Sequence, residues 1–374
     1  ALAALAHIAT ASFDDKSYII QRQAAKRLQR ILEEMPDHPG AHHYYIHAFD
    51  NPAHAEAVLP IADRYGTLTP VVPHATHMMT HIYTRLGEWR KSVEWNRKSA
   101  DAAWAICTDT GEISSHYTHA LDYLAYAYLQ MGIDEAALAA VKEATTIAGP
   151  FSELNPVASA YALSAMPARY ALERRDWERA ASLNPRQPAD FPWSTEHAPY
   201  EAITYFTRAL GHAHLGDTDA ARADTAVLQR LVEGLRGPSP YWAKQVDIQI
   251  YTASAWIAQA KGDSEAALKA MQKAVDLESS TEKSPVTPGE VLPAQELLGD
   301  LYLTQDSPKA ALAAYRASLA RSPGRMNSVL GALRAAQAAG LPEEVSRYRA
   351  ELLVLVDADT TRPGVQALAA ATSG

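Results

Sequence analysis

The apolar residues of the chain are spaced as in amphipathic helices, and alternation of β-branched residues is almost absent. Near the amino end, Ala24, Leu28 and Ile31 recur at three- and four-residue intervals ahead of Pro36, which is typical of a helix with one buried face. Alanine, leucine, glutamate, arginine and glutamine, which all favour helices, are abundant. The pattern predicts an all-α protein.

One of the predicted helices has an unusual polar face. It covers residues 73–86, with a proline at the favoured first position and Gly87 as a stop. One face is apolar and suits a core. The other carries His74, His77 and His81, whose spacings place the three imidazoles within ~60–80° of one another around the helix axis. A surface helix normally presents glutamate and lysine there, so this face is a candidate for chemistry.

Helix–turn–helix units recur along the chain. Residues 294–323 carry small and aromatic residues at the offsets of one such unit: Leu298, Gly299, Tyr302, Ala311, Tyr315 and Pro323. This unit resembles the tetratricopeptide repeat, a pair of helices that stacks on its neighbours to form a superhelix. Turn glycines of further units follow at Gly87, Gly132, Gly216 and Gly262, and a degenerate turn lies at Asp176.

The turn glycines are farther apart than the ~34 residues of that repeat. The excess lies in connections rich in proline and glycine, at residues 108–114, 184–199, 234–240 and 279–293. Residues 282–289 are too long for a simple connection. They are expected either to fold back as a lid or to form a rigid loop over helix ends.

The resemblance implies a right-handed, tetratricopeptide-like α-superhelix of about seven helical pairs with long loops between repeats. We expect a single solenoid over residues 1–374. Residues 1–150 would form histidine-rich repeats, 151–293 degenerate repeats with long loops, and 294–374 a regular unit with capping helices.

The segments 38–50, 73–89 and 284–301 also resemble a bacterial group of histidine-rich tetratricopeptide proteins. That resemblance implies no established reaction. Members of the group tend to carry a further amino-terminal segment, and this chain begins at Ala1 rather than at methionine. We expect a bacterial protein, either cytoplasmic or exported to the periplasm with its signal removed.

In tetratricopeptide superhelices the first helix of each unit lines the concave groove. Carried onto this sequence, that rule places histidines from three successive units in one groove. Seven of the 14 histidines fall into this arrangement: His43, His47, His74, His77, His81, His116 and His119. Asp122 is expected beside them as a ligand or as an orienting carboxylate, and Asp50 and Tyr126 are weaker candidates at groove positions.

Histidines packed this closely point to a transition metal. Pairs four residues apart lie ~6 Å apart along a helix, and neighbouring helices lie ~8–10 Å apart, so the rings can meet. Neutral imidazole binds copper, iron and zinc well. We predict one or two such ions in the groove. A catalytic site would support oxidation with copper or iron, or hydrolysis with zinc, but the pattern identifies no catalytic residues.

Three other functions are compatible with the same residues. The groove could hold a small molecule or an extended peptide without chemistry, as in a scaffold protein. It could store or deliver metal. The histidines could also be ordinary polar lining residues. His197, after Trp193, could reach the mouth of the groove, but a packing role in a loop that leads into a helix is favoured.

Composition excludes several classes of function. The net charge is −9 and no long basic run is present, which argues against nucleic acid as a partner. No apolar run reaches the ~18–20 residues that a membrane span needs. Cys107 is the only cysteine, so an intrachain disulfide is excluded. Phosphate-binding and dinucleotide-binding glycine motifs are absent, so no nucleotide cofactor is expected.

Overall fold

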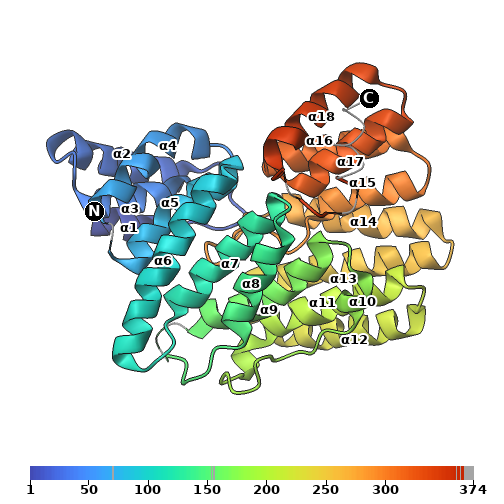
Figure 1. The fold of residues 1–374 in the computed structure, drawn as a ribbon, viewed down its shortest axis with the longest axis horizontal. Coiled ribbons are helices and arrows are strands. Elements are labelled where there is room, and N and C mark those ends of the chain that lie inside the picture. Colours follow the sequence, from blue (N-terminus) through green and yellow to red (C-terminus); the bar gives the residue numbers. More distant parts are fainter. Residues whose placement is uncertain (70, 153, 155, 359, 363, 366–374) are drawn as a thin grey trace.

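The computed structural model describes residues 1–374 except 70, 153, 155, 359, 363 and 366–374. Within this part of the chain the regular elements are helices, apart from one isolated bridge between Ile113 and Phe151. The predicted all-α array of helical pairs is confirmed (Figure 1).

In the described residues, eight consecutive helical pairs follow two amino-terminal helices, against about seven predicted. The amino-terminal helices are α1 (Leu2–Ile8) and α2 (Ile19–Glu34). The pairs are α3 (Pro39–Phe49) with α4 (Ala55–Leu68), α5 (Pro73–Leu86) with α6 (Trp89–Thr110), α7 (Ser115–Gln130) with α8 (Asp134–Thr145), α9 (Pro156–Glu173) with α10 (Trp177–Ala181), α11 (Ala198–His214) with α12 (Thr218–Leu235), α13 (Pro240–Ala260) with α14 (Ser264–Ser279), α15 (Ala294–Thr304) with α16 (Pro308–Arg321), and α17 (Met326–Ala338) with α18 (Pro342–Leu355). A short 3₁₀ helix, η1 (Thr195–His197), precedes α11.

The turns lie where the sequence predicts them. The four predicted turn glycines, Gly87, Gly132, Gly216 and Gly262, all have φ between 70° and 83°, the left-handed conformation that favours glycine. Two predicted connections are shorter than expected. Helix α6 continues to Thr110 and α12 to Leu235.

The array curves until its carboxyl-terminal pairs contact its amino-terminal ones. The Trp89 indole at the start of α6 donates a hydrogen bond to the carbonyl of Gly324, at 2.8 Å, in the α16–α17 turn. The Gln130 side chain at the end of α7 accepts one from the amide of Met326, at 3.0 Å. Figure 1 shows α16–α18 (red) beside α7 and α8 (green). The concave side of the array is therefore enclosed by its own ends.

Residues 281–293, which we call the interior segment, connect α14 to α15 and run through this enclosed space. The buried guanidinium of Arg169 on α9 donates to the carbonyl of Gly289 at 2.9 Å. The Tyr123 hydroxyl on α7 donates to the carbonyl of Thr287 at 2.9 Å. Of the two predictions for this loop, a lid-like position over the groove is therefore the one that the structure favours.

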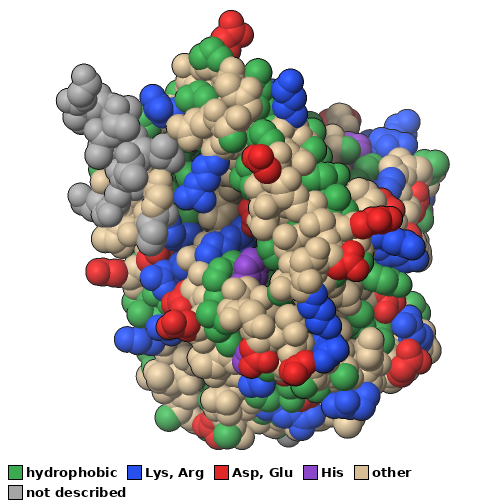
Figure 2. Space-filling view, turned by 90° about the vertical axis from the view of Figure 1, so that its right-hand side faces the viewer, with side chains coloured by type: hydrophobic (Ala, Val, Ile, Leu, Met, Phe, Trp, Pro, Cys, Tyr) green, Lys and Arg blue, Asp and Glu red, His purple; other side chains and the backbone are tan. Residues whose placement is uncertain are grey.

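The outer surface has two further features. None of the helices in the described ranges is both long and apolar enough to cross a membrane. The face turned to the right of Figure 1 has a hollow where a histidine lies among lysine and arginine side chains (Figure 2). Arg174, Arg175 and His214 line a cavity of about 550 Å³, and His214 stacks on Trp177 with ring centroids 3.7 Å apart. This agrees with a structural role for His214.

Candidate metal centre

Helices α3, α5 and α7 bring the seven predicted histidines together. Helix α5 is buried on all sides between its neighbours, so its histidines face α3 on one side and α7 on the other. Ring centroids are 5.0 Å apart for His43 and His74, 5.2 Å for His74 and His116, and 4.4 Å for His77 and His119. Two sets of three can each converge on a point: His43, His47 and His74, which we call the outer triad, and His77, His81 and His119, the inner triad.

The inner triad is sealed from solvent. Its three side chains are 1%, 2% and 9% exposed for His77, His81 and His119, and one ligand nitrogen from each lies within 4.8 Å of the other two. The Tyr123 ring packs edge-on against His77 and His119 and covers the cluster from α7.

Neighbouring oxygens fix the protonation of His77 and His81. The Asn96 amide donates its Nδ2 hydrogen to the carbonyl of Ser92 at 2.7 Å, so its Oδ1 faces His77 Nδ1, 2.7 Å away, as an acceptor. Asp50 Oδ2 lies 3.0 Å from His81 Nδ1 and also accepts. Both Nδ1 atoms are therefore donors, and each neutral ring has its lone pair on Nε2.

These two lone pairs face each other. His77 Nε2 and His81 Nε2 are 3.2 Å apart, too close for two acceptors unless a cation lies between them. Nitrogens that share a tetrahedral ion at ~2.0–2.1 Å are separated by ~3.3 Å, which matches this spacing. His119 Nδ1 is buried without a partner, which by itself costs ~1–3 kcal/mol. The inner triad therefore fits a metal ion.

Burial keeps all of these imidazoles neutral at neutral pH. Desolvation lowers the pKa of His77 and His119 well below the usual range, and the neighbouring histidines lower it further. In the outer triad, burial lowers the pKa of His43, His47 and His74 to about 3 each. Neutral imidazole is the form that binds a metal.

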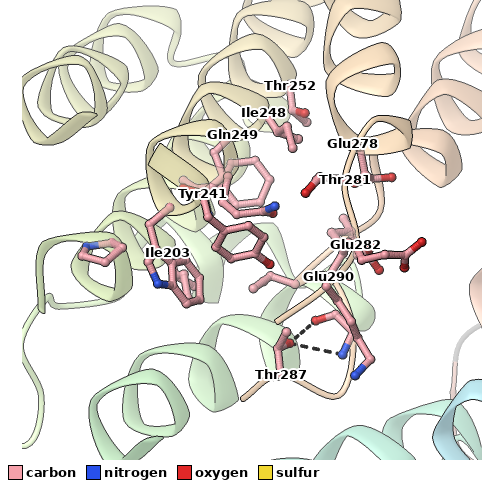
Figure 3. A pocket seen from close by; sticks show the side chains of 18 of the residues that line it. Ile203, Tyr241, Ile248, Gln249, Thr252, Glu278, Thr281, Glu282, Thr287 and Glu290 are labelled. Atoms are coloured by element: carbon pink, nitrogen blue, oxygen red, sulfur yellow. Dashed lines mark hydrogen bonds between the residues drawn. The ribbon is translucent and has the colours of Figure 1, made fainter. Parts of the chain in front are cut away.

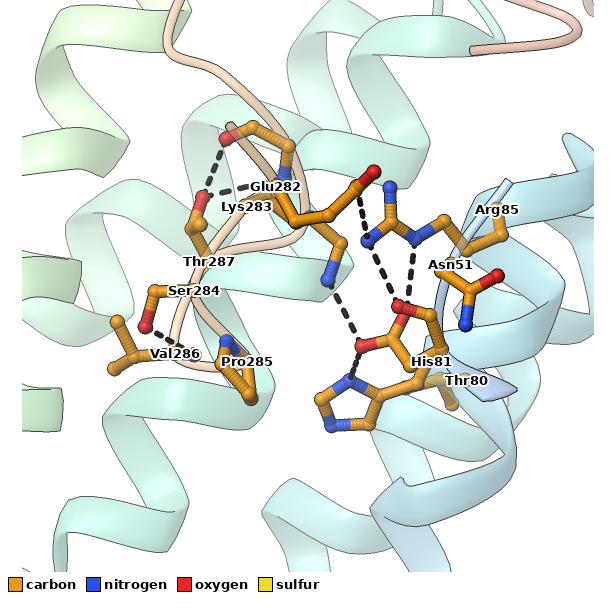
Figure 4. Close-up of polar contacts among 12 residues, drawn as sticks. Asn51, Thr80, His81, Arg85, Glu282, Lys283, Ser284, Pro285, Val286 and Thr287 are labelled. Carbon is orange, nitrogen blue, oxygen red and sulfur yellow. Dashed lines mark hydrogen bonds and ion pairs between the residues drawn. The ribbon is translucent and has the colours of Figure 1, made fainter. Parts of the chain in front are cut away.

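A buried charge network supports the inner triad (Figure 4). Asp50 accepts from Arg85 Nε at 2.8 Å and from Lys283 Nζ of the interior segment at 3.1 Å, besides its contact with His81. Burial favours the neutral acid, but Lys283 and Arg85 outweigh it and lower the pKa of Asp50 well below its usual value. Burial in turn lowers the pKa of Lys283 to about 8. The carboxylate stays ionised and holds His81 in one tautomer.

The outer triad is more open. His43, His47 and His74 are each partly buried, and His116 beside His74 is exposed. The Tyr65 hydroxyl lies 3.1 Å from His43 Nδ1 and orients that ring. His47 and His81 connect the two triads, with ring centroids 5.8 Å apart.

The remaining predicted residues lie in other surroundings. The fully buried carboxylate of Asp122 pairs with Arg169. The Tyr126 hydroxyl accepts from Arg325 Nη1 at 2.8 Å. His197 Nδ1 accepts from the amide of Ser194 at 3.0 Å and caps η1, which is the favoured packing role. Asp50, a weaker candidate, lies at the centre of the site.

The sequence did not identify Asn96, Lys283 and Tyr123 as parts of this site. A signal for Asn96 was present, because Ser92, Asn96 and Ser99 form an uncharged polar stripe on an otherwise charged helix, and all three are fully buried. Lys283 gave no local signal, since its partner lies 233 residues away.

The interior segment fills much of the groove between α11 and α13. Beside it remains a space of about 60 Å³, lined by Tyr241, Glu278, Glu290 and their neighbours (Figure 3). The Tyr241 hydroxyl accepts from the amide of Ser284 at 2.7 Å and fixes the segment on this side. A space of this size has room for a few water molecules but not for a peptide.

Comparisons with known proteins agree with the repeat class. The tetratricopeptide repeat family matches residues 248–281, which cover the end of α13 and all of α14. This match supports the tetratricopeptide superfamily, while the finer resemblance to a histidine-rich bacterial group stays a prediction. No curated protein matches the sequence.

Solved structures with similar folds share little sequence with this chain. The Cut9–Hcn1 structure of the APC/C matches with a TM-score of 0.39 and 15% identity over 95% of this chain, which spans 60% of that one. A tetratricopeptide repeat protein from Parabacteroides merdae has a TM-score of 0.36 and 10% identity, with 81% of this chain and 99% of that one covered. Yeast Tom70 has a TM-score of 0.36 and 14% identity, with 94% of this chain and 85% of that one covered.

Proposed function

We propose that this protein binds a transition metal ion, copper, iron or zinc, at the inner triad inside its helical array. The main observation behind this proposal is that the Nε2 atoms of His77 and His81 lie 3.2 Å apart while both Nδ1 atoms are held as donors. The unpartnered His119 nitrogen supplies a third ligand. The ion would supply Lewis-acid or redox chemistry, so a metal-dependent oxidoreductase or hydrolase is the enzyme class that the site would support.

The alternative is a scaffold that binds a peptide or protein partner, as tetratricopeptide proteins typically do. The interior segment already occupies the concave side next to α11 and α13, which leaves less room for a partner there. Metal storage or delivery is a third function, and it differs from catalysis in having an exchangeable ion and no turnover.

Elemental analysis of protein purified without a histidine tag tests the proposal. We expect near-stoichiometric metal, and we expect the double variant His77→Ala/His81→Ala to lose the inner-triad ion. His197→Ala/His212→Ala removes two imidazoles far from the triads and serves as the matched control, which should keep its metal.

Removal of metal tests the same point independently. An ion bound only by the folded state stabilises it, so a chelator should lower the melting temperature of the wild type by several degrees and that of the double variant by less, because the inner-triad ion is already missing there. Absence of metal together with an unchanged melting temperature in chelator would favour the scaffold.

A further inference from the structure

The two triads differ in what surrounds them. The inner triad is closed by Tyr123 and by the Asp50–Lys283 pair. The outer triad has partly buried rings and borders a cavity. An ion held by three protein ligands with room for a fourth, exchangeable one is typical of a reactive metal site, whereas a closed ligand set is typical of a structural one.

A cleft of about 230 Å³ leads to His47 of the outer triad. It lies between the α1–α2 connection, the end of α3 and the interior segment. Phe13, Tyr18 and Pro285 form apolar walls, and Asp50 lies at its inner end beside His47. Figure 4 shows Pro285 and Lys283 where the interior segment passes this end of the site. The volume is below the ~300–1,000 Å³ typical of drug-sized ligands, so an occupant is small.

Two residues that line this cleft, Gln21 and Glu282, each have a buried side-chain oxygen without a hydrogen-bond partner. The Gln21 side-chain oxygen on α2 is buried without a hydrogen bond and belongs to the cleft lining. Leaving such an acceptor unpaired costs ~1–3 kcal/mol, which a ligand that donates a hydrogen bond would offset. At the inner end, Asp50 pairs with Arg85 and Lys283, and Glu282 Oε1 accepts from Lys16 and Tyr18.

We propose that the outer triad holds a second metal ion with an open coordination position, and that a small molecule reaches this position through the cleft. The molecule would bind the ion through a lone pair and donate a hydrogen bond to Gln21, as a small alcohol or amine can. This inference rests on the proposed function and adds to it the site of ligand exchange.

Azide binding to the copper-loaded protein tests this assignment. Azide bound to Cu²⁺ gives a charge-transfer absorption band in visible or near-ultraviolet light. We expect about two copper ions per wild-type chain and an azide band. The variant His43→Ala/His74→Ala should lose one ion and the band, while His77→Ala/His119→Ala should lose one ion and keep the band.

A variant of the cleft tests the route. Ala11 lines the cleft, so Ala11→Trp should fill it. We expect azide affinity to fall at least tenfold with two copper ions still bound. Thr10→Trp, at the exposed neighbouring position outside the lining, is the matched control and should behave as wild type.

The outcomes separate the two proposals. A wild type without metal overturns the proposed function. A single ion, lost only from the inner-triad variant, overturns this inference and leaves the function standing. Two ions with an azide band that survives in His43→Ala/His74→Ala also overturn it, as does unchanged azide affinity in Ala11→Trp.

Discussion

Single hydrogen bonds decide what the histidines of this protein can do. The Nε2 lone pair of His77 points toward His81 only because Asn96 Oδ1 accepts the hydrogen on His77 Nδ1. The carbonyl of Ser92 holds the Asn96 amide in that orientation. Asp50 does the same for His81. Partners that orient a ligand in this way commonly change metal affinity ~10–100-fold when they are removed.

Asn96→Leu should therefore weaken metal binding by about 10–100-fold without unfolding the protein. The change keeps a side chain of similar size but leaves His77 Nδ1 without an acceptor. Competition with a chromophoric chelator measures the affinity, and circular dichroism checks the helix content. Asn96→Asp, which keeps an acceptor, should retain affinity near that of wild type. Equal affinities for the leucine and aspartate variants would show that Asn96 does not orient His77.

At the scale of elements, the interior segment is the part of the chain that a repeat pattern does not explain. It lies against helices from four different pairs through Asp50, Tyr123, Arg169 and Tyr241. Lys283 anchors it through a buried ion pair, with 3% of its side chain exposed against 5% for Asp50. A pair this buried is costly to break from one side, because the other charge stays behind.

Lys283→Met should lower the free energy of unfolding by roughly 1–3 kcal/mol. This loss is smaller than for a buried ion pair without other partners, because Arg85 still neutralises Asp50. It should also raise the pKa of His81, since Lys283 is one of the charges that lower it. Urea unfolding measures the first effect and NMR titration the second. Lys16→Met removes another ion pair that holds the segment. Because the Lys16 side chain is 34% exposed, this change should lower the free energy of unfolding by less than ~1 kcal/mol. A larger loss in Lys16→Met than in Lys283→Met would contradict the assignment.

At the scale of the whole molecule, the contact between the ends of the array encloses the site. The turn at Gly87 meets the α16–α17 turn so closely that a Cβ on this glycine would lie 2.7 Å from the carbonyl oxygen of Pro323. Arg362 pairs with Asp134 on α8 and adds a second contact between distant repeats. A solenoid normally couples only neighbouring units, and this closure couples the second and third helical pairs with the carboxyl-terminal ones.

Gly87→Ala and Gly216→Ala separate this contact from ordinary turn strain. Both glycines have positive φ, so alanine costs ~1–2 kcal/mol at either position. Only at Gly87 does the added Cβ meet another part of the chain, whereas nothing lies within 4 Å of it at Gly216. We expect Gly87→Ala to be the more destabilising by roughly 1–2 kcal/mol in urea unfolding, as for other overpacked contacts. Equal losses would mean that the two ends do not pack as tightly as described.

Local chemistry made the helices and their turns predictable. Residues 73–86 form a helix as expected, because its proline start, glycine stop and apolar spacing act within a few residues of one another. The predicted turn glycines have positive φ for the same reason. The meeting of the histidines also followed from the repeat, since equivalent positions of stacked units lie side by side.

The sequence by itself thus determined the helices, the repeat and the face on which the histidines gather. Only the tertiary structure decided that Asp122 pairs with Arg169, that Asp50 and Asn96 orient the inner triad, and that a segment from between α14 and α15 closes over it. The physical reason is the separation along the chain over which each interaction acts. Helix propensity and turn conformation depend on neighbours in the chain, whereas the partner of a buried charge depends on how the whole array curves back on itself.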